Sequence, residues 1–367
     1  STIKRAGITN HAVYGEAMLR ASISHIGRVD IAAGQKAFDE SREAVNRLAD
    51  SHPLHALSAL VESHLAVAKD AYQVANDILG KARLNAAGPL FGRLVAAQAN
   101  AVLRSKGPAA ARQLLEEARL NMEAQLPPGH PARGAVTSVR VAVLTAEARW
   151  EEALSALSVD IDGINAVAQN HVAALRLVLQ VCGLLNETGR TDEALQRAKE
   201  AATTIEQHLS PDHPLIGDAL RAQGIALYHQ GQYDAAENAL KRARKIHERA
   251  SGSQHPDSIA DLIQLTHVLR AQGRQAEAIQ LVSRTLSRIT KVPQLSQWTG
   301  RLELTGGWIK HEQGDFSGAK KYFKAARDRF KGHGIDGAQA EAQYALALMA
   351  MELGDPVTST TIAAQTL

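Results

Sequence analysis

The sequence contains little cysteine and few aromatic residues. Its 367 residues include a single cysteine, Cys182, and aromatic residues make up 4%. One cysteine excludes a disulfide framework and a cysteine-rich zinc site, and it favours a reducing compartment, so we expect a cytoplasmic protein. The chain also lacks an uninterrupted apolar stretch of about 18 residues, and we therefore predict no membrane span.

The charge is nearly balanced. Lys and Arg total 41 and Asp and Glu total 38, which gives a formal net charge of +3. No long basic run is present, so no nucleic-acid partner is expected. Apolar residues make up 45% of the chain, enough for a large core. Alanine is abundant and suits closely packed helices, whereas strands favour aromatic and β-branched residues, so the composition predicts an all-α fold.

Motifs that would indicate catalysis or cofactor binding are missing. The sequence has no G-x-S-x-G, G-x-x-x-x-G-K-[ST], H-E-x-x-H or G-x-G-x-x-G pattern. Asp160 and Asp162 form a carboxylate pair that we expect in a solvated loop between helices. Cys182 lies at a position of helix packing, where a buried inert thiol is expected. We therefore predict no catalytic residues, no metal site and no cofactor, and the chain is not expected to be an enzyme.

A repeat of about 42 residues organises the chain. Similar turns occur at Gly27, Asp70, Lys106, Ala148, Gly189, Gly231, Gly273, Gly314 and Gly354. Five residues after each turn the sequence has Ala32, Ala75, Ala111, Ala153, Ala194, Ala236, Ala278, Ala319 and then Ser359. Seven residues before most turns stands another small residue, such as Ser63, Cys182 or Gly224. Small residues at these spacings predict two closely packed helices joined by a turn, in which glycine supplies the positive φ.

Histidine recurs at the start of each predicted hairpin. His52, His130, His171, His213 and His255 each lie 18 residues before a turn, and all but His171 precede a proline. Proline in the first turn of a helix loses no needed hydrogen bond. Metal ligands must converge on one point, whereas these five histidines are one repeat apart. We therefore predict that they begin helices.

These repeats resemble the tetratricopeptide repeat in the 42-residue form of kinesin light chain. The resemblance rests on the pattern Gly224, Gly231, Ala236 and Ala243, and it covers nearly the whole chain. It implies a right-handed superhelical solenoid of eight to nine helical hairpins, with one array over residues 1–367. Residues 166–354 match the pattern best and residues 1–165 are degenerate, since Lys106 and Ala148 replace turn glycines and Arg20 and Val141 interrupt the row of small residues. The two ends lead us to expect a piece of a longer protein.

The resemblance also implies a concave groove, lined by the first helix of each hairpin, in which a peptide binds. The predicted binding residues are Asn186, Arg221, Tyr228, Gln264, His267, Arg270, Arg301, Trp308 and His311. Arginine pairs bidentately with carboxylates, asparagine can hold a peptide backbone, and Tyr and Trp provide flat apolar contacts. An acidic extended peptide is the expected ligand. The alternative is that these are ordinary solvated or packing side chains.

Three functions remain open. The favoured one is a protein-interaction or sensor module that regulates a bacterial signalling protein or transcription regulator. The second is a self-assembling scaffold, with homo-oligomers formed by stacking of the terminal repeats. The third is an RNA-binding helical repeat, which the 42-residue period and the near-neutral charge disfavour.

Overall fold

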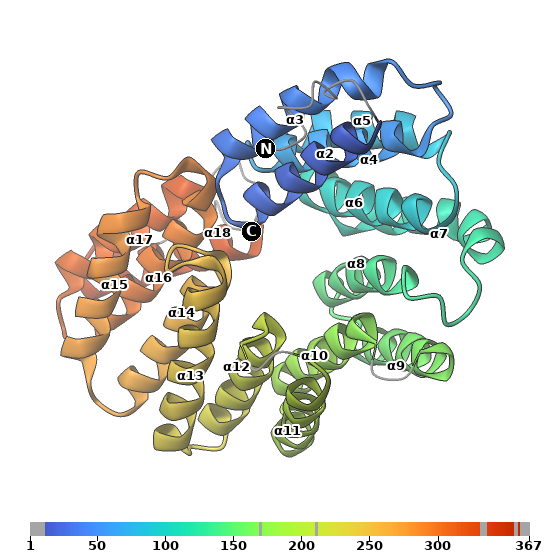
Figure 1. Cartoon of the computed structure of the whole chain (residues 1–367). Helices are drawn as coiled ribbons and strands as arrows, with labels where there is room; N and C mark the ends of the chain where they lie inside the picture. The colour runs from blue at the N-terminus through green and yellow to red at the C-terminus, as the bar shows by residue number, and fades with distance from the viewer. Residues whose placement is uncertain (1–11, 169–170, 210–211, 331–335, 356–358, 360–367) are drawn as a thin grey trace. The chain divides into compact units, whose positions relative to one another are not determined.

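The computed structural model describes residues 12–168, 171–209, 212–330, 336–355 and 359. Within these residues the chain forms 17 α-helices, α2 to α18, and no β-strand (Figure 1). The chain divides into two compact units, residues 1–184 and 185–367. The predicted all-α architecture of helical hairpins is confirmed, whereas a single array from residue 1 to 367 stays a prediction.

The first unit contains four hairpins and most of α10. Their helices are α2 (Ala12–Gly27), α3 (Ile31–Asn46), α4 (Pro53–Val67), α5 (Tyr72–Arg83), α6 (Gly88–Lys106), α7 (Pro108–Gln125), α8 (Arg133–Ala146), α9 (Trp150–Val167) and α10 (Val172–Glu187). Each even-numbered helix is the first helix of a hairpin and the following one is its second helix. First helices also pack on the next first helix, as α4 does between α2 and α6.

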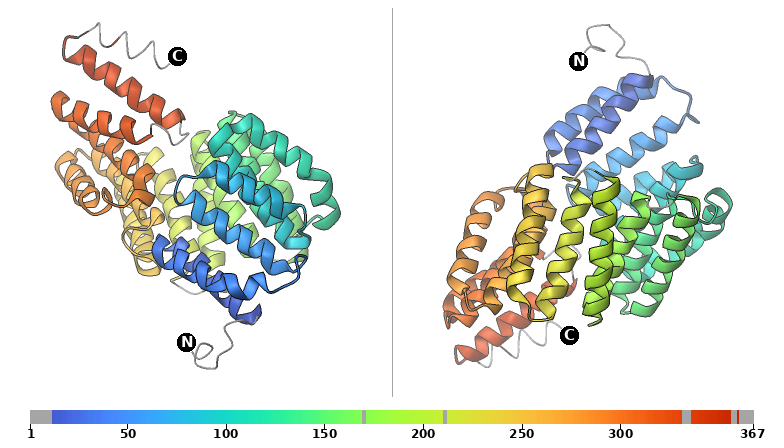
Figure 2. Two further views of the ribbon diagram at one scale, coloured as in Figure 1. Left: turned by 90° about the horizontal axis from the view of Figure 1, so that it is seen from above. Right: turned by 60° about the horizontal axis from the view of Figure 1, so that its bottom comes forward.

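The second unit contains the remaining helices. They are α11 (Thr191–His208), α12 (Pro214–His229), α13 (Tyr233–Ser251), α14 (Pro256–Ala271), α15 (Gln275–Ile289), the 3-10 helix η1 (Pro293–Leu295), α16 (Ser296–Glu312), α17 (Phe316–Phe330) and α18 (Asp336–Glu352). The second helices α13, α15 and α17 each lie between two first helices, and α12, α14 and α16 also contact one another in turn. Figure 2 shows these hairpins side by side, from yellow to red.

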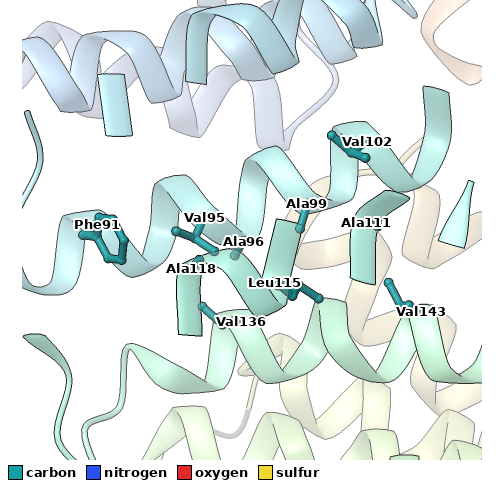
Figure 3. Packing of buried hydrophobic residues seen from close by; sticks show 10 residues of the cluster. All are labelled: Phe91, Val95, Ala96, Ala99, Val102, Ala111, Leu115, Ala118, Val136 and Val143. Atoms are coloured by element: carbon teal, nitrogen blue, oxygen red, sulfur yellow. The ribbon is translucent and has the colours of Figure 1, made fainter. Parts of the chain in front are cut away.

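Small residues bring the two helices of each hairpin together, as predicted. The alanines five residues after the turn have no solvent exposure from Ala75 to Ala319. Cys182 and Thr266, seven residues before their turns, are equally buried. At Gly224 an added Cβ would lie 2.6 Å from Cγ of Leu240, so glycine is needed for this close approach. Between the hairpins larger residues fill the core, such as Phe91 and Leu115 in the cluster of α6, α7 and α8 (Figure 3).

The turn residues adopt positive φ in seven of the predicted places. Gly189, Gly231, Gly273, Gly314 and Gly354 have φ between 73° and 78°. Asp70 and Ala148 have φ 57° although they are not glycine. The spacing of the repeat therefore identifies the left-handed residue even where glycine is missing.

The prediction for the first hairpin is wrong by two residues. The left-handed residue is Val29, with φ 63°, and Gly27 is instead the last residue of α2. Counted from Val29, the small positions are Ser22, Gly34 and Ser41, all buried. Ser22 donates a hydrogen bond to the carbonyl of Gly34 at 2.7 Å. The row of small residues is thus intact in this hairpin, and Arg20 and Ala32 lie outside it.

Two further predictions are corrected. The turn after α6 is formed by Gly107, with φ 84°, and Lys106 belongs to the helix. Only Gly107 separates α6 from α7, whereas three residues separate α12 from α13, so this turn is two residues shorter. Asp160 and Asp162 lie within α9 and not in a loop. The buried side chains of Leu157 and Ile164 keep α9 continuous through them.

Four of the five repeated histidines, His52, His171, His213 and His255, directly precede the first residue of a helix, as predicted, whereas His130 lies three residues before α8. In each one Nδ1 accepts a hydrogen bond from the backbone N–H two residues later, at 3.0 to 3.3 Å. Three of the prolines, Pro53, Pro214 and Pro256, are the first residues of their helices. Pro131 instead lies in a turn, since α8 begins at Arg133. None of the described helices is both long enough and apolar enough to span a membrane.

Candidate functional site

The predicted binding residues of the second unit fall into rows across successive first helices. Three residues before the turn glycine stand Asn186, Tyr228, Arg270 and His311, and six before it stand His267 and Trp308. We call these six residues the first-helix strip. It runs from α10 through α12 and α14 to α16, close to the end of each helix that leads into the turn. Tyr228 of α12 and His267 of α14 are in contact across neighbouring helices.

Aromatic side chains form the centre of the strip. The ring centroids of Tyr228 and His267 lie 6.5 Å apart in an edge-to-face arrangement. Trp308 and His311 are edge to face at 5.9 Å, and Trp308 also packs at 5.0 Å on Phe323. Such edge-to-face pairs hold rings in fixed orientations. The strip therefore offers partly exposed rings whose positions are set before any ligand binds.

His267 is neutral within this surface. Burial lowers its pKa, and the positive charge of Arg270 lowers it further, to about 4. A neutral imidazole has one donor and one acceptor nitrogen. His267 thus adds polar hydrogen-bonding capacity to the strip without adding charge at neutral pH.

The arginines of the predicted site are paired within the chain. Arg270 forms a bidentate ion pair with Glu312 of the next first helix, with Nε to the two carboxylate oxygens at 3.1 and 3.2 Å. Arg301 lies over the ring of Trp298, 5.5 Å from its centroid. The indole Nε1–H of Trp308 donates to Glu341 at 3.2 Å. Acids of neighbouring first helices thus already bind Arg270 and Trp308, two of the residues that the sequence predicted would contact a ligand.

Arg221 lies in a separate, mostly buried charge network. Its guanidinium contacts Asp218 on the same helix and, at 3.1 Å, the fully buried carboxylate of Asp261 on α14. Asp261 in turn lies 2.6 Å from Nδ1 of His247 on α13. Burial alone would lower the pKa of His247, but its hydrogen bonds with Asp218 and Asp261 outweigh this and raise it to about 9. Arg221 therefore ties α12 to α14 and has 19% side-chain exposure.

Two of the predicted binding residues, Asn186 and Gln264, carry amide groups. Asn186 is 5% exposed and donates through Nδ2 to the carbonyl of Ala222 at 3.4 Å. Its Oδ1 is buried and accepts no hydrogen bond among the described residues. A buried acceptor without a donor is unfavourable. Gln264 is half-buried on α14.

The sequence did not reveal the partners of these residues. Glu312, Glu341 and Asp261 each lie on the next first helix along the array from the residue they bind. For the pair of Arg270 and Glu312, the positions in the sequence do indicate the contact. Arg270 is three residues before its turn and Glu312 two residues before the following turn, which are adjacent positions of neighbouring repeats.

The first unit contains a cavity on its own first helices. It has a volume of about 620 Å³ and lies between α2, α4 and α6. Ile23, Leu54, Leu57 and Leu90 line it, together with the charged side chains of Glu16, Arg20 and Arg93. In the described part of the chain no group of three or more His, Cys, Asp or Glu residues is arranged to hold a metal ion.

Comparison with models of protein families identifies a known repeat in this chain. Models of the tetratricopeptide repeat match residues 173–249, 223–291 and 304–359. A search of curated protein sequences finds no match.

Three solved structures illustrate the similarity of fold. The apo form of the quorum sensor NprR from B. thuringiensis has a TM-score of 0.58 at 12% identity, over 96% of this chain and 97% of NprR. A Rap protein complexed with Competence and Sporulation Factor has a TM-score of 0.56 at 14% identity, over 94% of this chain and 100% of Rap. The STAND protein PH0952 from Pyrococcus horikoshii, which has a tetratricopeptide repeat sensor, has a TM-score of 0.54 at 10% identity, over 87% of this chain and 48% of PH0952.

Identities this low establish the fold alone. The repeat models agree with the 42-residue spacing from Gly189 to Gly231 and from Gly231 to Gly273, and with the paired helices around those turns. The chain is a tetratricopeptide repeat protein.

Proposed function

We propose that this chain is a protein-interaction or sensor module that binds an extended peptide or protein segment along the first-helix strip. One observation supports this most directly. Oriented rings and polar groups recur at the same repeat positions over four successive first helices, from Asn186 to His311. A segment that crosses these helices would meet a similar set of contacts at each repeat.

The chemistry of the strip favours recognition of backbone and apolar side chains. The half-buried amide of Gln264 could both donate a hydrogen bond to a peptide backbone and accept one from it. Tyr228 and Trp308 would pack on apolar side chains. An acidic ligand would bind Arg270 only by replacing Glu312, so the net gain from its charge would be smaller than an unpaired arginine provides.

The regulatory context is a further part of the proposal. The similar solved structures include a quorum sensor, a Rap protein with a bound factor and a STAND sensor. By analogy we propose that the chain regulates a cytoplasmic bacterial signalling protein or transcription regulator. This analogy rests on the shared fold alone, and it is tested by measuring what the first-helix strip binds.

Selection from a library of random peptides tests the binding proposal. The full chain is the bait, and the affinity of a selected peptide is measured by fluorescence anisotropy. Truncation of a central aromatic contact typically costs 1–2 kcal/mol or more, so Tyr228→Ala and Trp308→Ala should each weaken binding roughly tenfold. Tyr72→Ala on α5, a second helix of the first unit, is the matched control and should change affinity less than about twofold.

Two results would contradict the proposal. One is equal affinity of the selected peptides for the wild type, Tyr228→Ala and Trp308→Ala. The other is the absence of any selected peptide together with concentration-dependent assembly in light scattering, which would favour a scaffold.

A further inference from the structure

Basic residues are concentrated on the second helices of the second unit. Residues 241–249 of α13 include five Lys or Arg and one acid, and residues 320–329 of α17 also include five and one. Between them, residues 278–302 contain no acid at all. The near-neutral total of +3 therefore conceals a local excess of positive charge.

Some of these basic residues are paired with acids, namely Lys241, Arg242, Arg244, Arg249, Arg327 and Arg329. Others are exposed and have no ion pair among the described residues. Lys245 on α13, and Arg284 and Arg288 on α15, are all exposed. None of the three forms an ion pair among the residues that the structure describes. Arg221 and Arg270 on the first helices are in contrast each paired with a carboxylate of the next first helix. The free positive charge of this unit is thus on its second helices and not on the first-helix strip.

The geometry brings part of this charge into one groove. Side chains of α13 and α15 line a groove of about 490 Å³, with Leu265 and Leu269 of α14 beneath them. Lys241 and Lys245 form one wall and Arg284 belongs to the other. Arg288 continues the row of Arg284 along α15, because residues four apart lie on the same helix face.

The repeat extends the surface to a third helix. Residues at equal distances from successive turns occupy equivalent places in successive hairpins. Lys241 and Lys324 both lie ten residues after their turn glycine, and Arg242 and Arg284 both lie eleven after theirs. The exposed Lys320, Lys321 and Lys324 of α17 thus continue the positive surface beyond α15.

We propose that this surface, defined by Lys245, Arg284 and Arg288 and continued by Lys324, binds an acidic segment of a partner protein. Charge complementarity identifies the partner as acidic. Three carboxylates, those of Glu237, Glu248 and Glu277, lie among the basic side chains of the groove. A nucleic-acid backbone carries closely and evenly spaced charge and would be repelled by these carboxylates, whereas a protein segment can place separate acids opposite separate cations.

The proposal does not depend on peptide binding by the first-helix strip. The two surfaces lie on different helices, α13, α15 and α17 against α10, α12, α14 and α16. Substitutions that abolish binding at one surface are therefore expected to leave binding at the other surface unchanged, and the two can be tested separately.

The test uses the full chain and a labelled glutamate-rich peptide of about 20 residues as the probe. Binding is followed by fluorescence anisotropy at low and physiological salt. The triple variant Lys245→Glu, Arg284→Glu and Arg288→Glu should bind roughly tenfold or more weakly, because three attractive contacts become repulsive. The control is Lys36→Glu, Lys81→Glu and Lys199→Glu, which changes the net charge equally at exposed positions elsewhere and should lose less than about threefold.

The wild-type affinity should also fall steeply with salt, since exposed charges are screened within about 8 Å at physiological ionic strength. If the two triple variants lose affinity equally, the surface has no local role and the proposal fails. Tighter binding of a DNA duplex of about 20 base pairs than of the peptide, lost in the first triple variant, would assign the surface to nucleic acid instead. If the first triple variant does not fold by circular dichroism, glutamine at the same three positions provides the same comparison.

Discussion

The buried network around His247 predicts a loss of stability at alkaline pH. His247 is 1% exposed, and its ring lies between two acids, with Nδ1 2.6 Å from Asp261 and Nε2 3.5 Å from Asp218. Nε2 also donates to the carbonyl of Pro214 at 3.1 Å. Both ring nitrogens thus face acceptors, which fits a protonated imidazolium that joins α13 to α12 and α14.

The expected loss of unfolding free energy follows from the pKa of His247. In the folded chain the pKa of His247 is raised to about 9, compared with 6.5 for an ordinary histidine. Each pKa unit corresponds to about 1.4 kcal/mol, so the proton on His247 contributes about 3 kcal/mol to the free energy of unfolding. Because the folded pKa is the higher one, this contribution is complete below pH 6.5 and is lost as the pH rises through 9.

Urea unfolding at pH 6 and pH 9, followed by circular dichroism, measures this effect. The wild type should lose about 3 kcal/mol of unfolding free energy between the two pH values. His247→Gln has no titrating ring, so its own loss over this range should be much smaller, although it is less stable than the wild type at pH 6. The exposed His229 provides the control, since His229→Gln should show the full pH dependence of the wild type. Equal pH dependence in the wild type and His247→Gln would refute the assigned role of the network.

Three other predictions use the same unfolding assay. His267 has its pKa lowered to about 4, so the wild type should lose about 3 kcal/mol as the pH falls from 6.5 to 4, and His267→Gln should remove this loss. Gly224→Ala should cost roughly 1–3 kcal/mol, because its Cβ would lie 2.6 Å from Leu240, whereas Gly183→Ala meets no atom within 4 Å and should stabilise α10 by about 0.5–1 kcal/mol. His213→Ala should lower the free energy of unfolding by about 1 kcal/mol, because the N–H of Leu215 loses its capping acceptor. His213→Asn should retain most of this stability, since asparagine can cap the same N–H. Equal losses in the two variants would contradict the capping role.

The fold was predictable because the repeat specifies the packing position of single residues. Ala236 and Ala278 follow their turns by five residues and are fully buried, so the spacing alone locates the contact between helices. The glycine pattern misplaces the turn of the first hairpin, because Gly27 is the last residue of α2 and not the turn residue. There the left-handed residue is Val29, and Ser22 and Ser41 supply the small contacts that alanine supplies elsewhere. Serine is normally found at caps and turns, so its role in helix packing has no strong signal in a single sequence.

The candidate site was less predictable because charge pairing depends on residues about 40 positions apart. The repeat correctly places Arg270 and His311 three residues before their turns, in equivalent places on neighbouring first helices. The repeat does not by itself predict that Glu312 binds Arg270, or that Asp261 binds Arg221. These pairs appear only when the positions of neighbouring repeats are compared as adjacent surfaces.

Charge pairing within the second unit also limits how the two proposed surfaces can select their partners. A carboxylate that approaches Arg270 must compete with Glu312, which is already held bidentately and at no cost of association. A carboxylate that approaches Arg284 or Lys245 meets no such competitor among the described residues and pays mainly for loss of solvation at the surface. Ligands of the first-helix strip should therefore be distinguished by shape and hydrogen bonding, with weak salt dependence. Ligands of the second-helix surface should be distinguished by charge, with strong salt dependence.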